Sequence, residues 1–107
     1  MKGDHLGEFE ELVLLVISGS DEDAYGVAIK ETLDRETGRE VSLGAVYAAL
    51  ERLAGKGLVV SHEVEGPAVR GGRRRRAFEP TSEGRRVLRQ MRAVRERLWR
   101  HAHARGR

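Results

Sequence analysis

Hydrophobic residues recur at helical spacing through the first part of the chain. The sequence predicts an amphipathic helix over residues 6–18, where apolar side chains fall at i, i+3, i+4, i+7 and i+8: Phe9, Leu12, Val13, Val16 and Ile17. A second helix is predicted between an N-cap at Asp23 and Thr37, because apolar side chains recur every four residues: Tyr25, Ile29 and Leu33. Gly38 is expected to end this second helix.

A third helix is predicted over residues 43–54, after a short extended link at Val41. Ser42 precedes it as an N-cap, because a serine hydroxyl accepts a hydrogen bond from a free backbone N–H of the first turn. The buried face of this helix is a stripe at i, i+4 and i+7: Val46, Leu50 and Leu53. Gly55 and Gly57 are expected to stop it.

Apolar and polar residues then alternate over residues 58–64, which predicts a β-strand. A second strand over residues 74–79 would close a hairpin around a loop that is rich in glycine and arginine. Pro80 follows the second strand and has no backbone N–H, so the end of that strand is expected to be poorly paired.

The last helix is predicted over residues 82–103, with Thr81 as its N-cap. Its apolar residues follow a heptad-like spacing, and five of them are predicted to form a dimer interface: Val87, Leu88, Met91, Val94 and Leu98. At 1.5 Å per residue the helix is about 33 Å long, which exceeds what so small a core covers. A second copy of the chain is the economical partner for this surface.

This order of elements predicts a mainly α fold with a small β-hairpin. Residues 1–80 are expected to form a winged helix-turn-helix domain, and residues 81–107 one long C-terminal dimerisation helix with a short tail. The 107 residues include no cysteine, which excludes disulfides and thiolate metal sites. No apolar run reaches the length of a membrane span, and residues 1–5 are too polar for a signal peptide, so a cytoplasmic protein is expected.

Charge is divided unevenly between the two parts of the chain. Residues 1–65 hold 6 Lys/Arg and 14 Asp/Glu, whereas residues 66–107 hold 14 Arg and 3 Glu. Five arginines fall in or beside the predicted hairpin loop and are expected to bind phosphate: Arg70, Arg73, Arg74, Arg75 and Arg76. A polyanion is the natural partner of this second part. Mutual neutralisation of the two parts within a dimer is the alternative explanation.

In a winged helix-turn-helix the third helix enters the major groove and the hairpin loop lies along the backbone or minor groove. The residues predicted to contact DNA on or beside the third helix are Ser42, Gly44, Ala45, Tyr47, Ala48, Arg52 and Lys56. Small residues there let the backbone approach the bases, and Tyr47 is either a phosphate contact or a half-buried packing residue. Glu51 is the unusual charge, which either accepts from a cytosine amino group or orients an arginine.

Several segments resemble the PadR family of transcriptional regulators. The similar residues are 6–15, 23–29, 41–53, 56–59, 71–78 and 81–84, with a Gly-x-Val-Tyr-x-x-Leu core at residues 44–50. The short length and single C-terminal helix resemble the smaller PadR subfamily. The resemblance implies a dimeric repressor that binds an inverted repeat in double-stranded DNA, with a winged-helix domain and a C-terminal dimerisation helix.

The resemblance also implies a role for Trp99 on the last helix. Some small PadR proteins bind flat, often cationic drugs between the two C-terminal helices, with a tryptophan stacked on the ligand. Trp99 is therefore either a contact for a small-molecule effector or an anchor of the dimer interface. In the family the first helix packs near the last helix of the partner subunit. This placement implies that Glu8 and Glu11 face Arg89 or Arg92 of the partner subunit.

No catalytic constellation stands out, so neither an enzyme nor a cofactor is predicted. The spacing of His101 and His103 permits weak metal binding, but a solvated helix end is the favoured interpretation and no metal site is predicted. Two other functions remain open. A nonspecific nucleic-acid or protein-interaction module would use the arginines only as a charged patch, and a stand-alone small-molecule sensor would use Trp99 without binding DNA.

Overall fold

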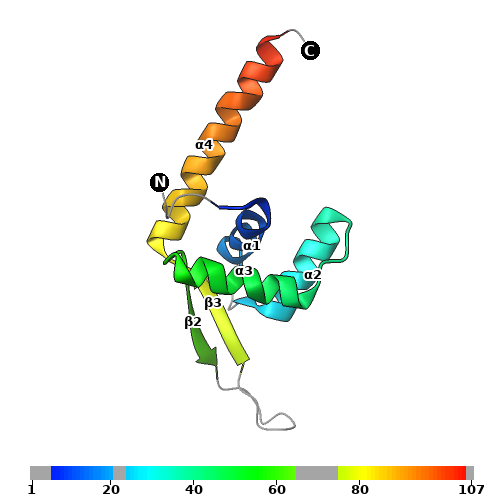
Figure 1. Ribbon diagram of the computed structural model, residues 1–107, viewed down its shortest axis with the longest axis vertical. Coiled ribbons are helices and arrows are strands. Elements are labelled where there is room, and N and C mark those ends of the chain that lie inside the picture. The colour runs from blue at the N-terminus through cyan, green and yellow to red at the C-terminus, as the bar shows by residue number, and fades with distance from the viewer. Residues whose placement is uncertain (1–5, 21–23, 65–74, 106–107) are drawn as a thin grey trace.

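The computed structural model describes residues 6–20, 24–64 and 75–105. The elements in chain order are α1 (Glu8–Ser18), β1 (Ala24–Tyr25), α2 (Gly26–Thr37), α3 (Leu43–Gly55), β2 (Val59–Val64), β3 (Arg75–Pro80) and α4 (Ser82–Ala104). Figure 1 shows α1, α2 and α3 gathered beside the β2–β3 hairpin, with α4 extending away from them. The predicted fold class, a winged helix-turn-helix with one long C-terminal helix, is confirmed.

Two of the predicted helix N-caps are confirmed and one is wrong. The Ser42 hydroxyl accepts from the backbone N–H of Ala45 at 3.0 Å, and the Thr81 hydroxyl accepts from that of Gly84 at 2.9 Å. The helix predicted to follow a cap at Asp23 instead begins at Gly26, with Tyr25 in the cap position. Asp23 itself lies outside the described residues.

The sheet contains a strand that the sequence pattern did not predict. β3 is its central strand, and the strand order is β1-β3-β2 with both pairs antiparallel. Ala24 and Tyr25, expected in the second helix, form β1 opposite Phe78 and Ala77. Pairing with β3 gives the backbone N–H and C=O groups of this dipeptide hydrogen-bond partners. This tertiary contact outweighs the helical preference that the spacing of Tyr25 indicates.

The expected loss of pairing at Pro80 is also wrong. β3 runs through Pro80, which lies opposite Val59 at the end of the β2–β3 register. Beyond Phe78 the strand has β2 as its only neighbour within the three-stranded sheet, and a strand with one open side tolerates a residue without an N–H. The hairpin therefore keeps its pairing up to the point where α4 begins.

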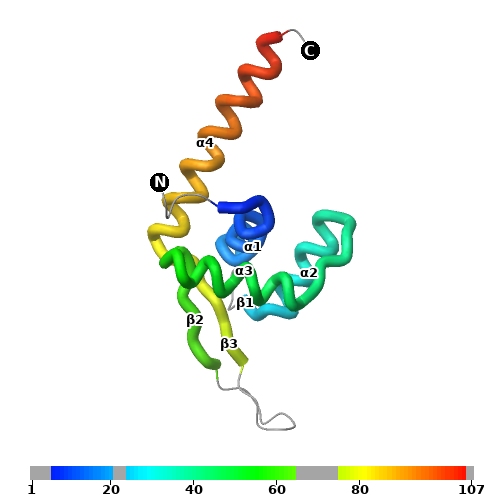
Figure 2. Tube along the Cα trace, in the orientation of Figure 1, coloured from blue at the N-terminus to red at the C-terminus, as the bar shows by residue number. Residues whose placement is uncertain are grey.

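The core lies where the three N-terminal helices meet the sheet and the first turns of α4. Residues of every helix contribute to it, including Leu14, Ile29, Leu50 and Val87, each at most 1% exposed. The sequence predicts Val87 at a dimer interface, but Val87 is 0% exposed in the single chain. It is a core residue because the start of α4 closes over the chain's own domain before the helix projects outward (Figure 2).

A candidate nucleic-acid interface

One face of α3 packs in the core and the opposite face is open. The buried residues are Val46, Ala49, Leu50 and Leu53, which matches the predicted stripe. Exposed residues of the other face include Gly44, Ala45, Tyr47, Ala48, Glu51 and Arg52. The first two turns therefore present small side chains around one aromatic ring, a surface that lets a helix backbone come close to base edges.

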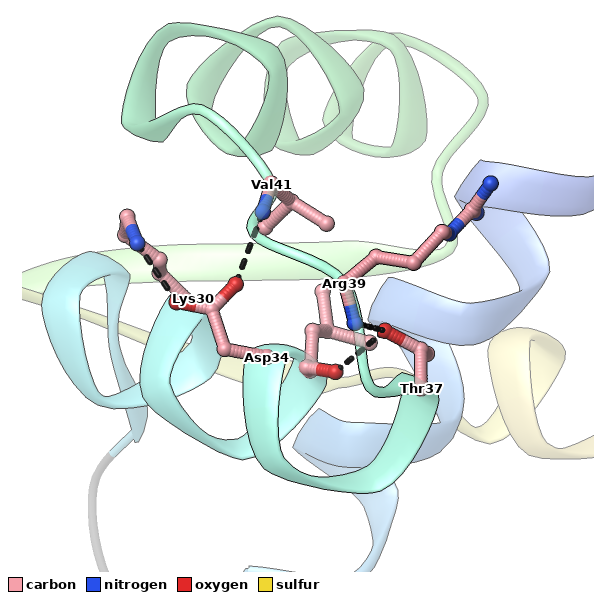
Figure 3. A network of polar contacts seen from close by, with 6 residues as sticks. Lys30, Asp34, Thr37, Arg39 and Val41 are labelled. Atoms are coloured by element: carbon pink, nitrogen blue, oxygen red, sulfur yellow. Dashed lines mark hydrogen bonds and ion pairs between the residues drawn. The ribbon is translucent and has the colours of Figure 1, made fainter.

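The start of α3 is fixed by a polar network at the end of α2 (Figure 3). The Asp34 carboxylate accepts from the backbone N–H of Val41 at 2.7 Å and from the Lys30 ammonium at 2.5 Å. The hydrogen bond from Lys30 and then that from Val41 hold the pKa of Asp34 below its usual value. This carboxylate thus ties the helix-turn-helix link to α2. Only the i, i+4 spacing of Lys30 and Asp34 was visible in the sequence.

Tyr47 is held by the N-terminus of α2. Its side chain lies so close to Gly26 that a Cβ built on the glycine would meet the Tyr47 Cζ and hydroxyl oxygen at 2.5 Å. Tyr47 remains 43% exposed, so both uses considered for it, packing and a contact with DNA, are compatible with its position. Gly26 is the residue that permits the close approach, because any other residue would displace the ring.

The far end of α3 is held by Glu10 of α1. Its Oε2 accepts from Arg52 Nε at 2.5 Å and its Oε1 accepts from Lys56 Nζ at 2.7 Å. Burial raises the pKa of Glu10, but the hydrogen bonds from Lys56, Arg52 and the Gly7 N–H outweigh burial and leave that pKa below its ordinary value. Glu10 is therefore ionised at neutral pH. Arg52 and Lys56, both predicted to contact DNA, are already paired within the protein.

The arginines at the loop end of the β2–β3 hairpin, where β3 begins, are exposed and oriented by neighbours. The Arg75 guanidinium lies 4.7 Å from the centre of the Tyr25 ring, a cation–π arrangement. Arg76 Nη1 donates to the Ser61 hydroxyl at 2.8 Å across the hairpin. Arg70, Arg73 and Arg74, also predicted to bind phosphate, lie outside the described residues.

A groove of about 440 Å³ lies between α3 and the hairpin. Residues from both elements line it: Tyr47, Leu50, Glu51, Ala54, Ser61, Arg76 and Phe78. The structure therefore brings Tyr47 of the predicted recognition helix and Arg76 of the predicted wing to one concave surface. Arg52 and Lys56 are instead held at the α1 side of α3 by Glu10.

The projecting end of α4 carries a second concave surface. A hollow of about 280 Å³ is lined by Arg95, Leu98, Trp99 and Ala102. Trp99 is 66% exposed, and its ring centre lies 6.1 Å from that of His103. Arg95 pairs with Glu11 of the same chain, with Arg95 Nε donating to Glu11 Oε2 at 3.2 Å. Glu11 thus has a partner in its own chain, whereas the sequence-based expectation placed it against Arg89 or Arg92 of the partner subunit.

Within the described part of the chain, no cluster of three or more histidine, cysteine or acidic side chains is arranged to hold a metal ion. None of its helices combines the length and the apolar character that crossing a membrane requires.

Comparisons with known proteins place the chain in a family. Residues 13–90 match the family described as "Transcriptional regulator PadR-like family", and a search of curated proteins found no match. The chain is similar to a PadR family transcriptional regulator from Eggerthella lenta DSM 2243, with 31% identity and a TM-score of 0.70. That similarity covers 91% of this chain and 84% of the solved one.

Two further solved structures share the fold of this chain. A PadR-like transcription factor from Bacteroides fragilis is 25% identical with a TM-score of 0.75, over 90% of this chain and 87% of that one. Bacillus subtilis PadR in complex with operator DNA is 14% identical with a TM-score of 0.65, over 78% of this chain and 46% of that one, and it supports the fold alone. On its matched residues and its fold, the chain belongs to the PadR-like family of transcriptional regulators.

Proposed function

We propose that this chain is a dimeric transcriptional repressor that binds an inverted repeat in double-stranded DNA. The observation that carries the proposal is the groove in which the open face of α3 meets the hairpin beside Arg76. A helix with small outward residues beside a basic hairpin suits a major groove flanked by phosphates. Bacillus subtilis PadR, which shares the fold, was solved in complex with operator DNA, and this supports DNA as the partner.

Each predicted contact has a distinct role in this proposal. Gly44, Ala45 and Ala48 let α3 approach base edges, while Ser42 and the helix N-terminus receive a phosphate. Arginines of the hairpin bind phosphates of the DNA backbone on both sides of the major groove. Tyr47, Arg52 and Lys56 at the edges of α3 do the same. The winged helix of residues 1–80 thus binds DNA, and residues 81–107 set the distance between the two copies.

The projecting part of α4 supports the proposed homodimer. Val94 and Leu98 are 44% and 61% exposed, and Leu88 and Met91 are only partly covered by the core. An exposed apolar face of this length is typical of a surface that pairs with a copy of itself. A two-fold dimer along α4 would carry two α3 helices to successive major grooves, about 34 Å apart.

We further propose that a small-molecule effector relieves repression by binding beside Trp99. The hollow lined by Arg95, Leu98 and Trp99 lies on the same face of α4 as the apolar residues, so a dimer partner would enclose it. A ligand there would change the spacing of the two α4 helices and hence of the two α3 helices. The remaining interpretation of Trp99 is an anchor of the interface, in which case no ligand enters.

Selection of duplexes from a random pool tests the proposed function. We expect an inverted repeat whose half-site centres are one helical turn, about 10 base pairs, apart. Arg76→Gln should weaken binding to every duplex and lower the slope of log affinity against log salt by about 0.9, because one phosphate contact is lost. Arg97→Gln is the matched control, since Arg97 is exposed on α4 away from the groove.

The second candidate, a nonspecific module, predicts a different outcome of the same selection. Recovered duplexes would share no sequence, and RNA, single strands and duplex would bind with similar affinity. Such a result would contradict the repressor proposal even if Arg76→Gln still weakened binding.

A further inference from the structure

Glu10 is a buried carboxylate that connects α1 with the far end of the recognition helix. The residue is 7% exposed, and both of its oxygens accept hydrogen bonds from cations that lie 42 and 46 positions later in the chain. Glu10 Oε1 also lies 3.4 Å from the Gly7 N–H, which fixes the carboxylate at the start of α1. No feature of the local sequence pattern requires an acidic residue to face inward at this position.

We propose that Glu10 is a positioning residue for DNA recognition, which holds Arg52 and Lys56 so that Arg52 meets one particular phosphate and neither cation binds the backbone indiscriminately. The inference rests on the proposed function, because it concerns how selectively that function is carried out. It assigns to α1 a part in specificity, although α1 itself does not enter the groove in the proposed complex.

The different contacts of the inner and terminal nitrogens of Arg52 support this role. Glu10 engages Nε, the inner nitrogen, and no other hydrogen bond joins the Arg52 side chain to a residue in the described ranges 6–20, 24–64 and 75–105. An arginine has five N–H donors, so the four on the terminal nitrogens remain available to a phosphate. The Arg52 side chain is 53% exposed, whereas that of Glu10 is 9% exposed, so the outer end faces solvent while the inner end is tied down.

The charge of Glu10 also limits nonspecific binding. The three side chains of Glu10, Arg52 and Lys56 together carry one net positive charge, because one ionised carboxylate lies between two cations. Two unrestrained cations would add nonspecific affinity, because each one that neutralises a phosphate releases a counterion from any duplex. A phosphate contact held in one place fixes the register of α3 on the bases instead. Glu10 therefore lowers the affinity for random duplex DNA and fixes the register of α3 on the bases.

Glu10→Gln tests the proposal, because glutamine keeps the shape and one acceptor but removes the charge. We expect tighter binding to random duplex and a slope of log affinity against log salt that is steeper by about 0.9. The ratio of operator to random affinity should fall by about tenfold. An unchanged slope, or a loss of both affinities by one common factor, would show that Glu10 only stabilises the fold and would overturn the proposal.

Arg52→Lys keeps the test decisive if the Glu10 variant does not fold. Lysine preserves the charge at an exposed position and keeps the ion pair between Lys56 and Glu10. A single ammonium group, however, cannot bind the carboxylate and a phosphate at once in the geometry of an arginine fork. The affinity ratio should fall as in Glu10→Gln, while the salt slope stays unchanged. Retention of the wild-type ratio in this variant would overturn the positioning role.

The combined variant separates action through Arg52 from other effects. In an Arg52→Gln background, Glu10→Gln should change the affinity ratio no further, because the positioned group is already gone. A further fall in the ratio would contradict the proposal. If the wild-type protein shows no operator preference, the proposed function fails, yet the salt slope of Glu10→Gln on random duplex still reports whether Glu10 restrains the two cations.

Discussion

The two halves of α4 share one apolar spacing but have opposite surroundings. In the first half Gly84 and Val87 are buried, and a Cβ added to Gly84 would collide with the Leu58 carbonyl group. In the second half Val94 and Leu98 are exposed to solvent. Figure 1 shows the reason, since only the start of the helix lies against the rest of the fold. Periodicity thus identifies an apolar face without saying which molecule covers it.

The difference implies that stability and the proposed dimer assembly are set by separate stretches of one helix. The contact between Arg95 and Glu11 links the projecting part of α4 back to α1. Up to Met91 the apolar residues belong to or pack against the chain's own core, and beyond it they are available to a partner. Substitutions of the same chemical kind in the two halves should therefore have different consequences.

The largest expected difference is between Val87→Asp and Val94→Asp. Val87 is 0% exposed, so an aspartate there would place an unpaired charge in the core and cost more than about 4 kcal/mol, enough to unfold a small domain. Val94 is 44% exposed, and the same change should leave the free energy of unfolding of a dilute monomer within about 0.5 kcal/mol. Circular dichroism during urea titration measures both values. A folded Val87→Asp protein would remove the distinction between the halves.

That distinction was only partly visible in the sequence. Local signals gave correct expectations: the caps at Ser42 and Thr81, the end of α2 at Gly38 and the buried stripe of α3. Each depends on residues within one or two helical turns, where sequence spacing and spatial distance are nearly equivalent. The apolar face of α4 was recognised for the same reason, but its division at Met91 depends on where the other helices lie.

Long-range contacts account for what the sequence did not reveal. The β1 strand exists because Tyr25 lies opposite Ala77, and the Glu10 site exists because α1 crosses the end of α3. In the sequence, Glu10 in the first turn of α1 and the two cations Arg52 and Lys56 look like ordinary surface charges. Only the packing of α1 against α3 brings the buried Glu10 carboxylate to these two partly exposed cations.

A smaller effect is expected for the assembly itself, through Leu98→Asp. Leu98 is 61% exposed and lines the hollow beside Trp99, so its replacement should not unfold the chain. At the centre of a proposed dimer interface it should raise the dimer dissociation constant by at least about thirtyfold, as truncation of an anchor residue does. Sedimentation equilibrium measures this constant, with Arg97→Asp as the control on another face of α4. Equal effects of the two variants would argue against the apolar face as the interface.

The smallest expected effect concerns the ion pair that joins the projecting half of α4 to α1. The Glu11 side chain is 11% exposed and its partner Arg95 is 55% exposed, so solvent screens the pair and Glu11→Gln should cost about 1 kcal/mol or less. Glu96→Gln is the matched control, because Glu96 pairs with Arg92 on the same projecting helix and is 54% exposed. If the Glu11 pair ties α4 to α1, thermal melts in low salt should show a larger loss for Glu11→Gln than for Glu96→Gln. The difference in stability loss between the two variants should become smaller in about 1 M salt, where the screening length falls to roughly 3 Å.

Equal losses at both salt concentrations would mean that packing around Met91 alone sets the direction of the projecting helix. The position of the second recognition helix on DNA would then depend on the apolar residues of α4 and not on its charges.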